Sequence, residues 1–192
     1  LHAARLACQQ GVPRCQIISY QDDCALLEEL FTHDGSGTLV ATSDYEQSRT
    51  ADIEDVGGIL ELIEPLEQQG ILLKRSRELL EQEIDRFRVL ERDGRVIACA
   101  ALYPFADEGC GEIACVVTHP DYRGGQRGNR LLQELEQEAS SLGLDRVFVL
   151  STQTAHWFLE QGFAESQADE LPGRKQELYN LQRNSKVFFK KL

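Results

Sequence analysis

The sequence predicts a mixed α/β domain whose sheet is antiparallel in its first half. Three observations support this fold class. Two segments of helical periodicity come first, a tight hairpin follows at Asp93-Gly94, and a continuous apolar strand over 146–150 comes after a long amphipathic helix. The expected order is two helices, a hairpin, a strand, a glycine-rich loop, a helix, a strand, a helix and a strand.

Residues 1–44 are expected to form a separate, short and incomplete α/β segment. Gly11 is suited to ending a first helix, and Asp22 or Asp23 to capping a second one. Two short helices and a strand bury too little surface for a stable core, so this segment is expected to belong to a larger domain. The expected elements are a helix over 1–10, a strand over 15–20, a helix over 25–31 and a turn over 33–38.

Residues 45–192 contain the predicted α/β domain. Its α/β pattern begins at Arg49, after a linker that includes Ser43, Asp44, Gln47 and Ser48. Asp52 is expected to cap a first helix, which Pro65 breaks or bends, and Ser76 to cap a second. The apolar positions are Ile53, Val56, Ile59, Leu60 and Ile63 in the first helix, and Leu80, Ile84 and Phe87 in the second.

The second half of this domain alternates strands and helices. Strands over 89–92 and 95–102 flank Asp93-Gly94, the pair that favours a type I′ turn. Further strands are expected over 112–118 and 146–150, a long helix from Gly128, a short helix over 154–161, and β-prone segments over 177–189. The apolar face of the long helix consists of Leu131, Leu132, Leu135, Ala139 and Leu142, and Gly143 ends it.

Composition excludes several classes of partner. A formal net charge of −12 argues against nucleic acid and anionic membranes, and no apolar run reaches the length of a membrane span. The six cysteines form no CxxC pair and have no histidine cluster beside them, so structural zinc is not expected. Reduced cysteines and the missing secretory signal indicate a cytoplasmic protein. The chain contains no Met, even at position 1, which indicates a fragment or a processed form.

A glycine-rich loop between a strand and a helix is the strongest chemical signal. Gly124, Gly125 and Gly128 allow a ligand to approach the backbone, and the first N–H groups of the helix lack partners. Arg123 and Arg127 add positive charge, so the loop is suited to a diphosphate. The alternative interpretation is a glycine-rich surface turn ahead of a surface helix.

This order of elements resembles the GNAT family of N-acetyltransferases. The family's loop pattern, Arg/Gln-x-x-Gly-x-Gly/Ala, matches Arg123 and Gly128, but Gln126 replaces the middle glycine. Gln126 is therefore expected to supply its N–H without a positive φ, or the loop takes another path. AHWFLEQGF (155–163) resembles the next family signature, with Phe158 where many members have a tyrosine that acts as general acid.

The whole chain also resembles the bacterial N-acetylglutamate synthase family. The resemblance implies acetyl transfer from acetyl-CoA, a co-substrate rather than a permanently bound cofactor, to L-glutamate in arginine biosynthesis. It also implies that residues 1–44 are the tail of an amino-acid-kinase-like domain through which arginine inhibits the full-length protein, a homo-oligomer. The matching stretches are ISYQDDCALLEELFTHDGSGT (18–38), GGILELIEPLEQQG (57–70), KRSRELLEQEID (74–85), ACAALYPF (98–105), GEIACV (111–116), HPDYR (119–123), FVLST (148–152), HWFLEQGF (156–163) and LYNLQRNSKV (178–187).

The resemblance assigns candidate catalytic roles to two residues. Glu112 is the candidate base, acting through a water chain because an ordinary carboxylate is a weak base for an ammonium group. Ser151 is the candidate that assists the leaving thiolate, since Phe158 cannot donate a proton. The alternatives are a solvated glutamate at a strand end and a serine that caps the helix beginning near Thr154.

Three further sets of residues are expected to bind the two substrates. The Cys115 N–H is expected to support the acetyl carbonyl, with Val116 and Val117 aligning the pantetheine arm; a cysteine nucleophile is the alternative. Cations suit the two carboxylates of glutamate, and a solvated basic face is their alternative role. The expected CoA ligands in the loop are Arg123, Gly124, Gly125, Gln126, Arg127, Gly128 and Asn129, and the expected glutamate ligands are Leu73, Arg75 and Arg183, with Lys74, Arg77 and Lys186 nearby in sequence.

Two competing functions remain open at this stage. One keeps acetyl transfer but changes the acceptor to a polyamine or a protein N-terminus, and the cations near Arg75 and Arg183 argue against a polyamine. The other is a non-catalytic module that senses acyl-CoA or an amino acid, which would bind ligand without turnover.

Overall fold

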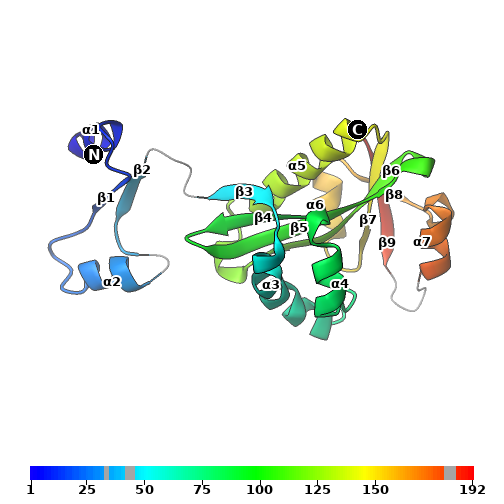
Figure 1. The fold of residues 1–192 in the computed structure, drawn as a ribbon, viewed down its shortest axis with the longest axis horizontal. Coiled ribbons are helices and arrows are strands. Elements are labelled where there is room, and N and C mark those ends of the chain that lie inside the picture. The colour runs from blue at the N-terminus through cyan, green and yellow to red at the C-terminus, as the bar shows by residue number, and fades with distance from the viewer. Residues whose placement is uncertain (33–34, 42–45, 180–184) are drawn as a thin grey trace. The chain divides into compact units, whose positions relative to one another are not determined.

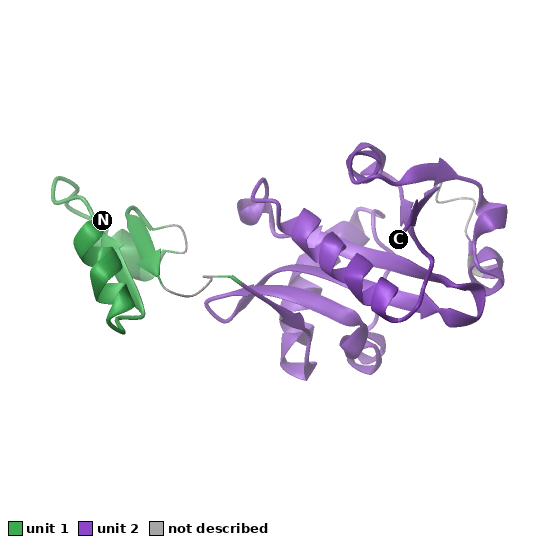
Figure 2. Cartoon of the chain, turned by 90° about the horizontal axis from the view of Figure 1, so that it is seen from above, with its two compact units in different colours: residues 1–46 green, residues 47–192 purple. Residues whose placement is uncertain are grey.

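The computed structural model describes residues 1–32, 35–41, 46–179 and 185–192 (Figure 1). These residues form two compact units, Leu1–Glu46 and Gln47–Leu192 (Figure 2). Each unit is considered by itself.

The first unit is small and has almost no interior. It consists of α1 (His2–Gln9), β1 (Arg14–Ile17), α2 (Ala25–Phe31) and β2 (Thr38–Ala41), with β1 and β2 antiparallel. Helix α2 has the predicted bounds, but neither Asp22 nor Asp23 caps it through its side chain, because Cys24 is the N-cap. Among the described residues of this unit, only Cys8 and Ala25 are buried, which agrees with the expectation that it cannot form a sizeable core.

The second unit is built on a mixed sheet, as predicted. In the described part of the chain this sheet has seven strands in the order β3-β4-β5-β6-β7-β9-β8, and β6 and β7 are its parallel pair. The strands are β3 (Gln47–Thr50), β4 (Phe87–Arg92), β5 (Arg95–Phe105), β6 (Cys110–Thr118), β7 (Arg146–Ser151), β8 (Ala164–Ser166) and β9 (Lys186–Lys191). Asp93 and Gly94 have φ values of 52° and 75°, as the predicted type I′ hairpin requires.

Helices cover both faces of this sheet. Alternate side chains of β5 point to opposite sides, and the residues from Val96 to Leu102 are buried on both. Ala98, Ala100 and Leu102 pack with the apolar face of α5, whereas Cys99 and Ala101 pack with α3. Figure 1 shows these two helices on opposite sides of the sheet. The helices of the unit are α3 (Val56–Gln68), α4 (Arg77–Gln82), α5 (Arg127–Ser141), α6 (Ala155–Glu160) and α7 (Gly173–Leu178).

Several predicted boundaries were wrong, and tertiary pairing explains two of them. Gln47 and Ser48 belong to β3, which pairs with β4, rather than to a linker. The Ser76 side chain accepts a hydrogen bond from the Leu79 N–H as predicted, but α4 ends at Gln82. Phe87 then pairs with Ala101 at the start of β4, so strand pairing replaces the expected end of the helix.

Three other expectations also need correction. Helix α3 continues past Pro65 to Gln68, so of the two expected effects of the proline, a break in the helix is contradicted. Leu142 follows the last residue of α5 and is exposed, so it lies outside the apolar face of that helix. The segment expected to be β-prone over 177–189 begins inside helix α7, and strand β9 starts at Lys186.

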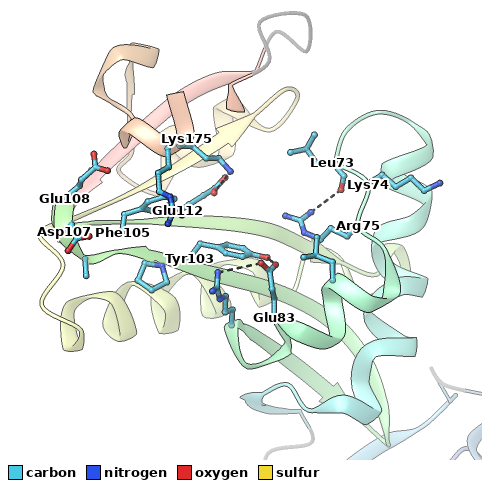
Figure 3. A pocket seen from close by; sticks show the side chains of 15 residues that line it. Leu73, Lys74, Arg75, Glu83, Tyr103, Phe105, Asp107, Glu108, Glu112 and Lys175 are labelled. Carbon is cyan, nitrogen blue, oxygen red and sulfur yellow. Dashed lines mark hydrogen bonds and ion pairs between the residues drawn. The ribbon is translucent and has the colours of Figure 1, made fainter. Parts of the chain in front are cut away.

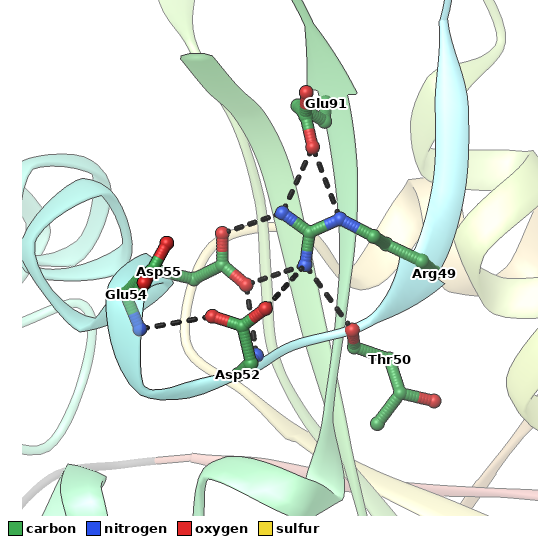
Figure 4. Close-up of polar contacts among 6 residues, drawn as sticks. All are labelled: Arg49, Thr50, Asp52, Glu54, Asp55 and Glu91. Atoms are coloured by element: carbon green, nitrogen blue, oxygen red, sulfur yellow. Dashed lines mark hydrogen bonds and ion pairs between the residues drawn. The ribbon is translucent and has the colours of Figure 1, made fainter. Parts of the chain in front are cut away.

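Arg49 joins three elements at one end of the sheet (Figure 4). Its guanidinium donates to both oxygens of Asp55 at 2.6 and 2.8 Å and to Glu91 Oε2 at 2.8 and 3.0 Å. Asp55 also accepts from the Asp52 N–H at 2.8 Å, within the capping box ahead of α3. Burial by itself raises the pKa of Asp55, but the hydrogen bonds from Arg49 and Asp52 outweigh this and lower it.

We expect Arg49→Met to destabilise the protein by about 2–3 kcal/mol, because it leaves the buried Asp55 carboxylate without its cation. The melting temperature should fall by about 4–12 °C in calorimetry. Since the folded-state pKa of Asp55 is lowered, its contribution is present above the unfolded pKa of about 3.9 and is lost as the pH falls through the folded value. Stability should therefore decline more steeply below about pH 4 in the parent than in the variant. Arg77→Met, which removes an exposed pair with Glu81, is the control, and an equal effect of both changes would contradict the prediction.

Candidate active site

Strands β6 and β7 separate partway along their length. Their parallel pairing runs from Cys110 to Glu112 on β6, opposite Arg146 to Phe148 on β7. Between β5 and β6 the register passes from Cys99↔Val117 to Ala101↔Ala114, so β6 contains one extra residue, and Cys115 has a φ of 52°. Such a bulge bends the strand that carries it. An opening of about 60 Å³ follows, lined by residues that include Cys115, Ser151 and Phe158.

A cavity of about 750 Å³ lies at the C-terminal part of β6. Its lining includes Val116, Val117 and all residues of the predicted CoA loop except Gly125. Gln126 has a φ of 57°, so the expectation that it avoids a positive φ was wrong: this glutamine takes the left-handed conformation expected of the family's glycine. Helix α5 begins at the next residue, and the Gln126 side chain does not cap it. The start of a helix is a favourable place for an anion.

The polar side chains of the loop also hold its structure. Arg127 donates to the Tyr122 carbonyl at 2.6 Å and lies over the Tyr122 ring, and Arg123 contacts the Thr118 carbonyl at 3.5 Å. Asn129 accepts from Trp157 Nε1 at 3.1 Å, which connects α5 to α6. Direct contact of the loop with a diphosphate remains a prediction. The candidates for this contact are Arg123, Gly124, Gly125, Gln126 and Arg127.

Gly128 lies against Trp157. A side chain at position 128 would therefore meet this ring, in addition to limiting the approach of a ligand to the backbone. A Cβ added at Gly128 would lie 3.3 Å from Trp157 Cζ2. We expect Gly128→Val to displace this ring from the cavity and to weaken CoA binding by at least about tenfold, the effect of 1.4 kcal/mol. Calorimetric titration with CoA checks this, with melting temperature as the measure of folding. Gly57→Ala, in open space on α3, is the control, and undiminished CoA affinity of the Gly128 variant would contradict the prediction.

A second cavity of about 750 Å³ lies at the N-terminal part of β6 (Figure 3). Its lining combines side chains from the segment before α4, from β5 and β6, and from α7. A small acidic or zwitterionic molecule suits this mixture of charges. The cations are Lys74, Arg75, Arg86, Arg174 and Lys175, and the anions are Glu83, Asp107, Glu108 and Glu112.

Glu112 occupies the inner wall of this cavity. Only 9% of its side chain is exposed, and its carboxylate contacts Lys175 Nζ at 2.6 Å. Lys175 and Arg174 come from α7, which sequence reasoning missed. The available signal was Pro172-Gly173 before two basic residues, in a chain that is otherwise acidic.

Arg75 reaches toward the same wall from the other side of the cavity. It donates to the Leu73 carbonyl at 3.2 Å, and its backbone N–H donates to Glu67 at 2.9 Å. Burial alone lowers the pKa of this guanidinium, but the neighbouring Cys115 and Tyr103 side chains outweigh that effect and raise it. Arg75 therefore carries a permanent charge beside Glu112.

The residues expected to bind glutamate, and the cations near them in sequence, do not all meet at this cavity. Leu73 and Arg75 line it, as does Lys74. Arg77 instead pairs with Glu81, and Lys186 pairs with Glu165. Arg183 lies outside the described residues, so its place remains a prediction.

Cys115 and Ser151 lie on opposite sides of the opening between β6 and β7. Burial raises the pKa of the Cys115 thiol to about 11, which argues against a cysteine nucleophile. Ser151 Oγ accepts from the Thr154 N–H at 3.0 Å and lies 2.8 Å from Thr154 Oγ1. Ser151 therefore bonds to Thr154, the N-cap residue of α6, whose own side chain makes no cap bond, and Ser151 also lines the opening.

Two other kinds of feature are absent from the described residues. No group of three or more His, Cys, Asp or Glu side chains in this part of the chain is arranged to hold a metal ion. No helix within it has the length and apolar character needed to cross a membrane.

Comparisons with known proteins agree with this geometry. The family model described as "Acetyltransferase (GNAT) family" matches residues 58–163. The amino-acid acetyltransferase of Azotobacter vinelandii is 58% identical over all 192 residues, and the chain spans 44% of the length of that relative.

Two solved structures of N-acetylglutamate synthase from Neisseria gonorrhoeae are similar over the whole chain. The complex with coenzyme A and L-arginine has a TM-score of 0.87 at 42% identity, and the chain covers 43% of it. The complex with coenzyme A and N-acetyl-glutamate has a TM-score of 0.75 at 44% identity, with 45% covered. The predicted fold is confirmed, and the chain belongs to the GNAT acetyltransferase family.

Proposed function

We propose that the chain transfers an acetyl group from acetyl-CoA to the α-amino group of L-glutamate, giving N-acetyl-L-glutamate and CoA. The observation that supports the proposal most directly is that consecutive residues of β6 line three spaces one after another. Glu112 lines the cavity with the cations, Ile113–Val116 line the opening, and Val116–Thr118 line the cavity with the loop. An amine on one side and a thioester on the other can therefore meet at this strand.

The proposed reaction is direct attack of the amine on the thioester. Glu112 accepts a proton from the ammonium group, directly or through water, and the neutral nitrogen attacks the acetyl carbon. The Cys115 N–H supports the oxyanion, because a residue in a bulge leaves the regular ladder. The C–S bond breaks at the opening, where the Ser151 hydroxyl donates its proton to the thiolate of CoA. The attacking nitrogen then loses its second proton, which restores the hydroxyl of Ser151.

The charges of the acceptor cavity favour glutamate over a polyamine. Within the described residues, Lys74, Arg75 and Arg174 make no ion pair with a carboxylate, so these cations are available to an acidic ligand. A polyamine would meet like charge here. The relative from Azotobacter and the two complexes from Neisseria support the same acceptor class.

Acetyl-CoA consumption against a panel of acceptors tests the proposal. Glutamate should be acetylated well above glutamine and spermidine, because an acceptor without the side-chain carboxylate leaves a cation of the cavity without a partner. Aspartate should also be a poorer acceptor, because its side-chain carboxylate is one methylene shorter. Equal rates with glutamine would overturn the choice of acceptor. Ligand binding without turnover of any acceptor would instead favour a sensing module.

The wider setting is part of the proposal. A longer protein would act in arginine biosynthesis in the cytoplasm as a homo-oligomer, with residues 1–44 as the tail of an arginine-binding domain and residues 45–192 as the acetyltransferase domain. The exposed apolar side chains of α2, which include Leu27, Leu30 and Phe31, support a larger partner surface for the first unit.

Arginine is expected not to bind the 192-residue chain, because two short helices and two short strands are too small to enclose a ligand. Calorimetry with arginine checks this expectation, and acetyl-CoA in the same experiment shows that the chain is competent to bind ligand. Tight, saturable binding of arginine would contradict it.

A further inference from the structure

The contact between Lys175 and Glu112 places a cation where the acceptor's own cation has to arrive. Lys175 Nζ lies 2.6 Å from Glu112 Oε2, and their side chains are 19% and 9% exposed. Figure 3 shows the Lys175 side chain extending from α7 to this carboxylate, and both residues line the cavity. The base proposed for the reaction is therefore already in contact with an ammonium group.

Helix α7 is held at its start, whereas the ammonium group of Lys175 is at the end of a long side chain. The N–H groups of Lys175 and Gln176 donate to the Pro172 carbonyl, and the Gly173 N–H donates to Glu108 at 3.2 Å. The Gln176 side chain adds bonds to the Asp169 and Leu171 carbonyls. Four methylene groups separate the ammonium nitrogen from Cα, so the ammonium can move while the helix stays in place.

A protonated amine cannot easily give its proton to Glu112 while Lys175 remains in contact. Two ammonium groups at one carboxylate repel each other, and a neighbouring cation makes any carboxylate a weaker proton acceptor. Proton transfer therefore requires that Lys175 takes another anionic partner. An amino acid brings one, because its α-carboxylate and α-amine share a carbon atom.

We propose that Lys175 is a displaceable counterion of Glu112 that the α-carboxylate of the acceptor draws away. This inference rests on the proposed function. Without an acceptor, Lys175 neutralises Glu112; when the acceptor binds, Lys175 pairs with its α-carboxylate, and Glu112 takes one proton from the ammonium. Lys175 is thus a positioning and specificity-determining residue that makes the base available to amines that carry an adjacent carboxylate.

Acceptor analogues separate this role from a structural one. The α-amide of glutamate lacks only the α-carboxylate, and glutamine lacks only the side-chain carboxylate. The parent should prefer glutamate to the α-amide by about 10- to 150-fold in kcat/KM, as expected for a lost charged hydrogen bond. In Lys175→Met this preference should shrink at least about tenfold, while the preference for glutamate over glutamine, which other cations determine, should change less than about threefold.

Two more variants complete the experiment. Lys175→Arg should restore most of the preference for glutamate over the α-amide, because it restores the cation. Lys191→Met removes an exposed positive charge on β9, outside both cavities, and should leave both preferences unchanged. The calorimetric affinity for CoA should be the same in all variants.

The outcomes distinguish this inference from the proposed function. If the parent acetylates neither glutamate nor its analogues, the proposed function fails. If the parent acetylates glutamate but Lys175→Met keeps its preference over the α-amide, the counterion role is overturned. Equal losses with all three acceptors in Lys175→Met would also overturn it, since they would indicate a purely structural role.

Discussion

Replacing Glu112 with Gln is expected to lower kcat for glutamate by about 10²- to 10⁴-fold, the range for loss of a general base. Glutamine keeps the size and shape of the side chain but cannot take a proton from the ammonium group. The backbone position should persist, because Glu112 pairs with Tyr103 on β5 and with Phe148 on β7. Initial-rate kinetics with glutamate and acetyl-CoA measure the effect.

The affinity for CoA and the melting temperature are the controls for Glu112→Gln. CoA affinity should stay within about twofold of the parent, since the loop cavity lies at the other end of β6. Asp107→Asn is a matched change of an exposed carboxylate that lines the same cavity, and it should retain most of the activity. A kcat for Glu112→Gln within about threefold of the parent would remove Glu112 from the role of base.

Replacing Arg75 with Ala is expected to raise the KM for glutamate by about 10- to 150-fold, the effect of losing a charged hydrogen bond worth about 1.5–3 kcal/mol. The physical reason is that Arg75 carries a permanent charge beside Glu112 and can grip a carboxylate with two donors. The KM for acetyl-CoA should change little. Substrate-dependence curves for each substrate at saturating levels of the other measure both values.

Arg77→Ala is the matched control for Arg75→Ala. Arg77 lies two residues away, but it pairs with Glu81 and does not line the cavity, so its loss should leave both KM values near those of the parent. Arg183→Ala is expected to behave like Arg75→Ala. If either of these two arginine changes weakened acetyl-CoA alone, that residue would be reassigned to the phosphates of CoA.

Local sequence signals predicted much of the fold. The Asp93-Gly94 turn, the Ser76 cap, helix α2 and the start of α5 near Gly128 were all expected from short stretches of chain. These features depend on backbone preferences and hydrogen bonds within a few residues, which a single sequence displays. The glycine-rich loop belongs to this group, because the strand, loop and helix follow one another directly.

The candidate site could be predicted only where residues belong to such a local motif or to a stretch that resembles a known family. Glu112, Cys115 and Ser151 were expected in this way, and the structure places all three along the parting of β6 and β7. Local signals misled where distant partners compete with them. Phe87 continues a helical pattern in sequence, yet its pairing with Ala101 makes it a strand residue.

The sequence by itself therefore determined the local elements, the loop and, through family resemblance, which residues of β6 are candidates for the site. Only the tertiary structure decided that Lys175 from α7 contacts Glu112, that Trp157 packs on Gly128, and that Gln47–Thr50 forms the outer strand. These contacts join residues 29 and 63 positions apart or depend on which strands become neighbours. Periodicity and capping act over a few residues, so they contain no information about such pairings until the sheet has formed.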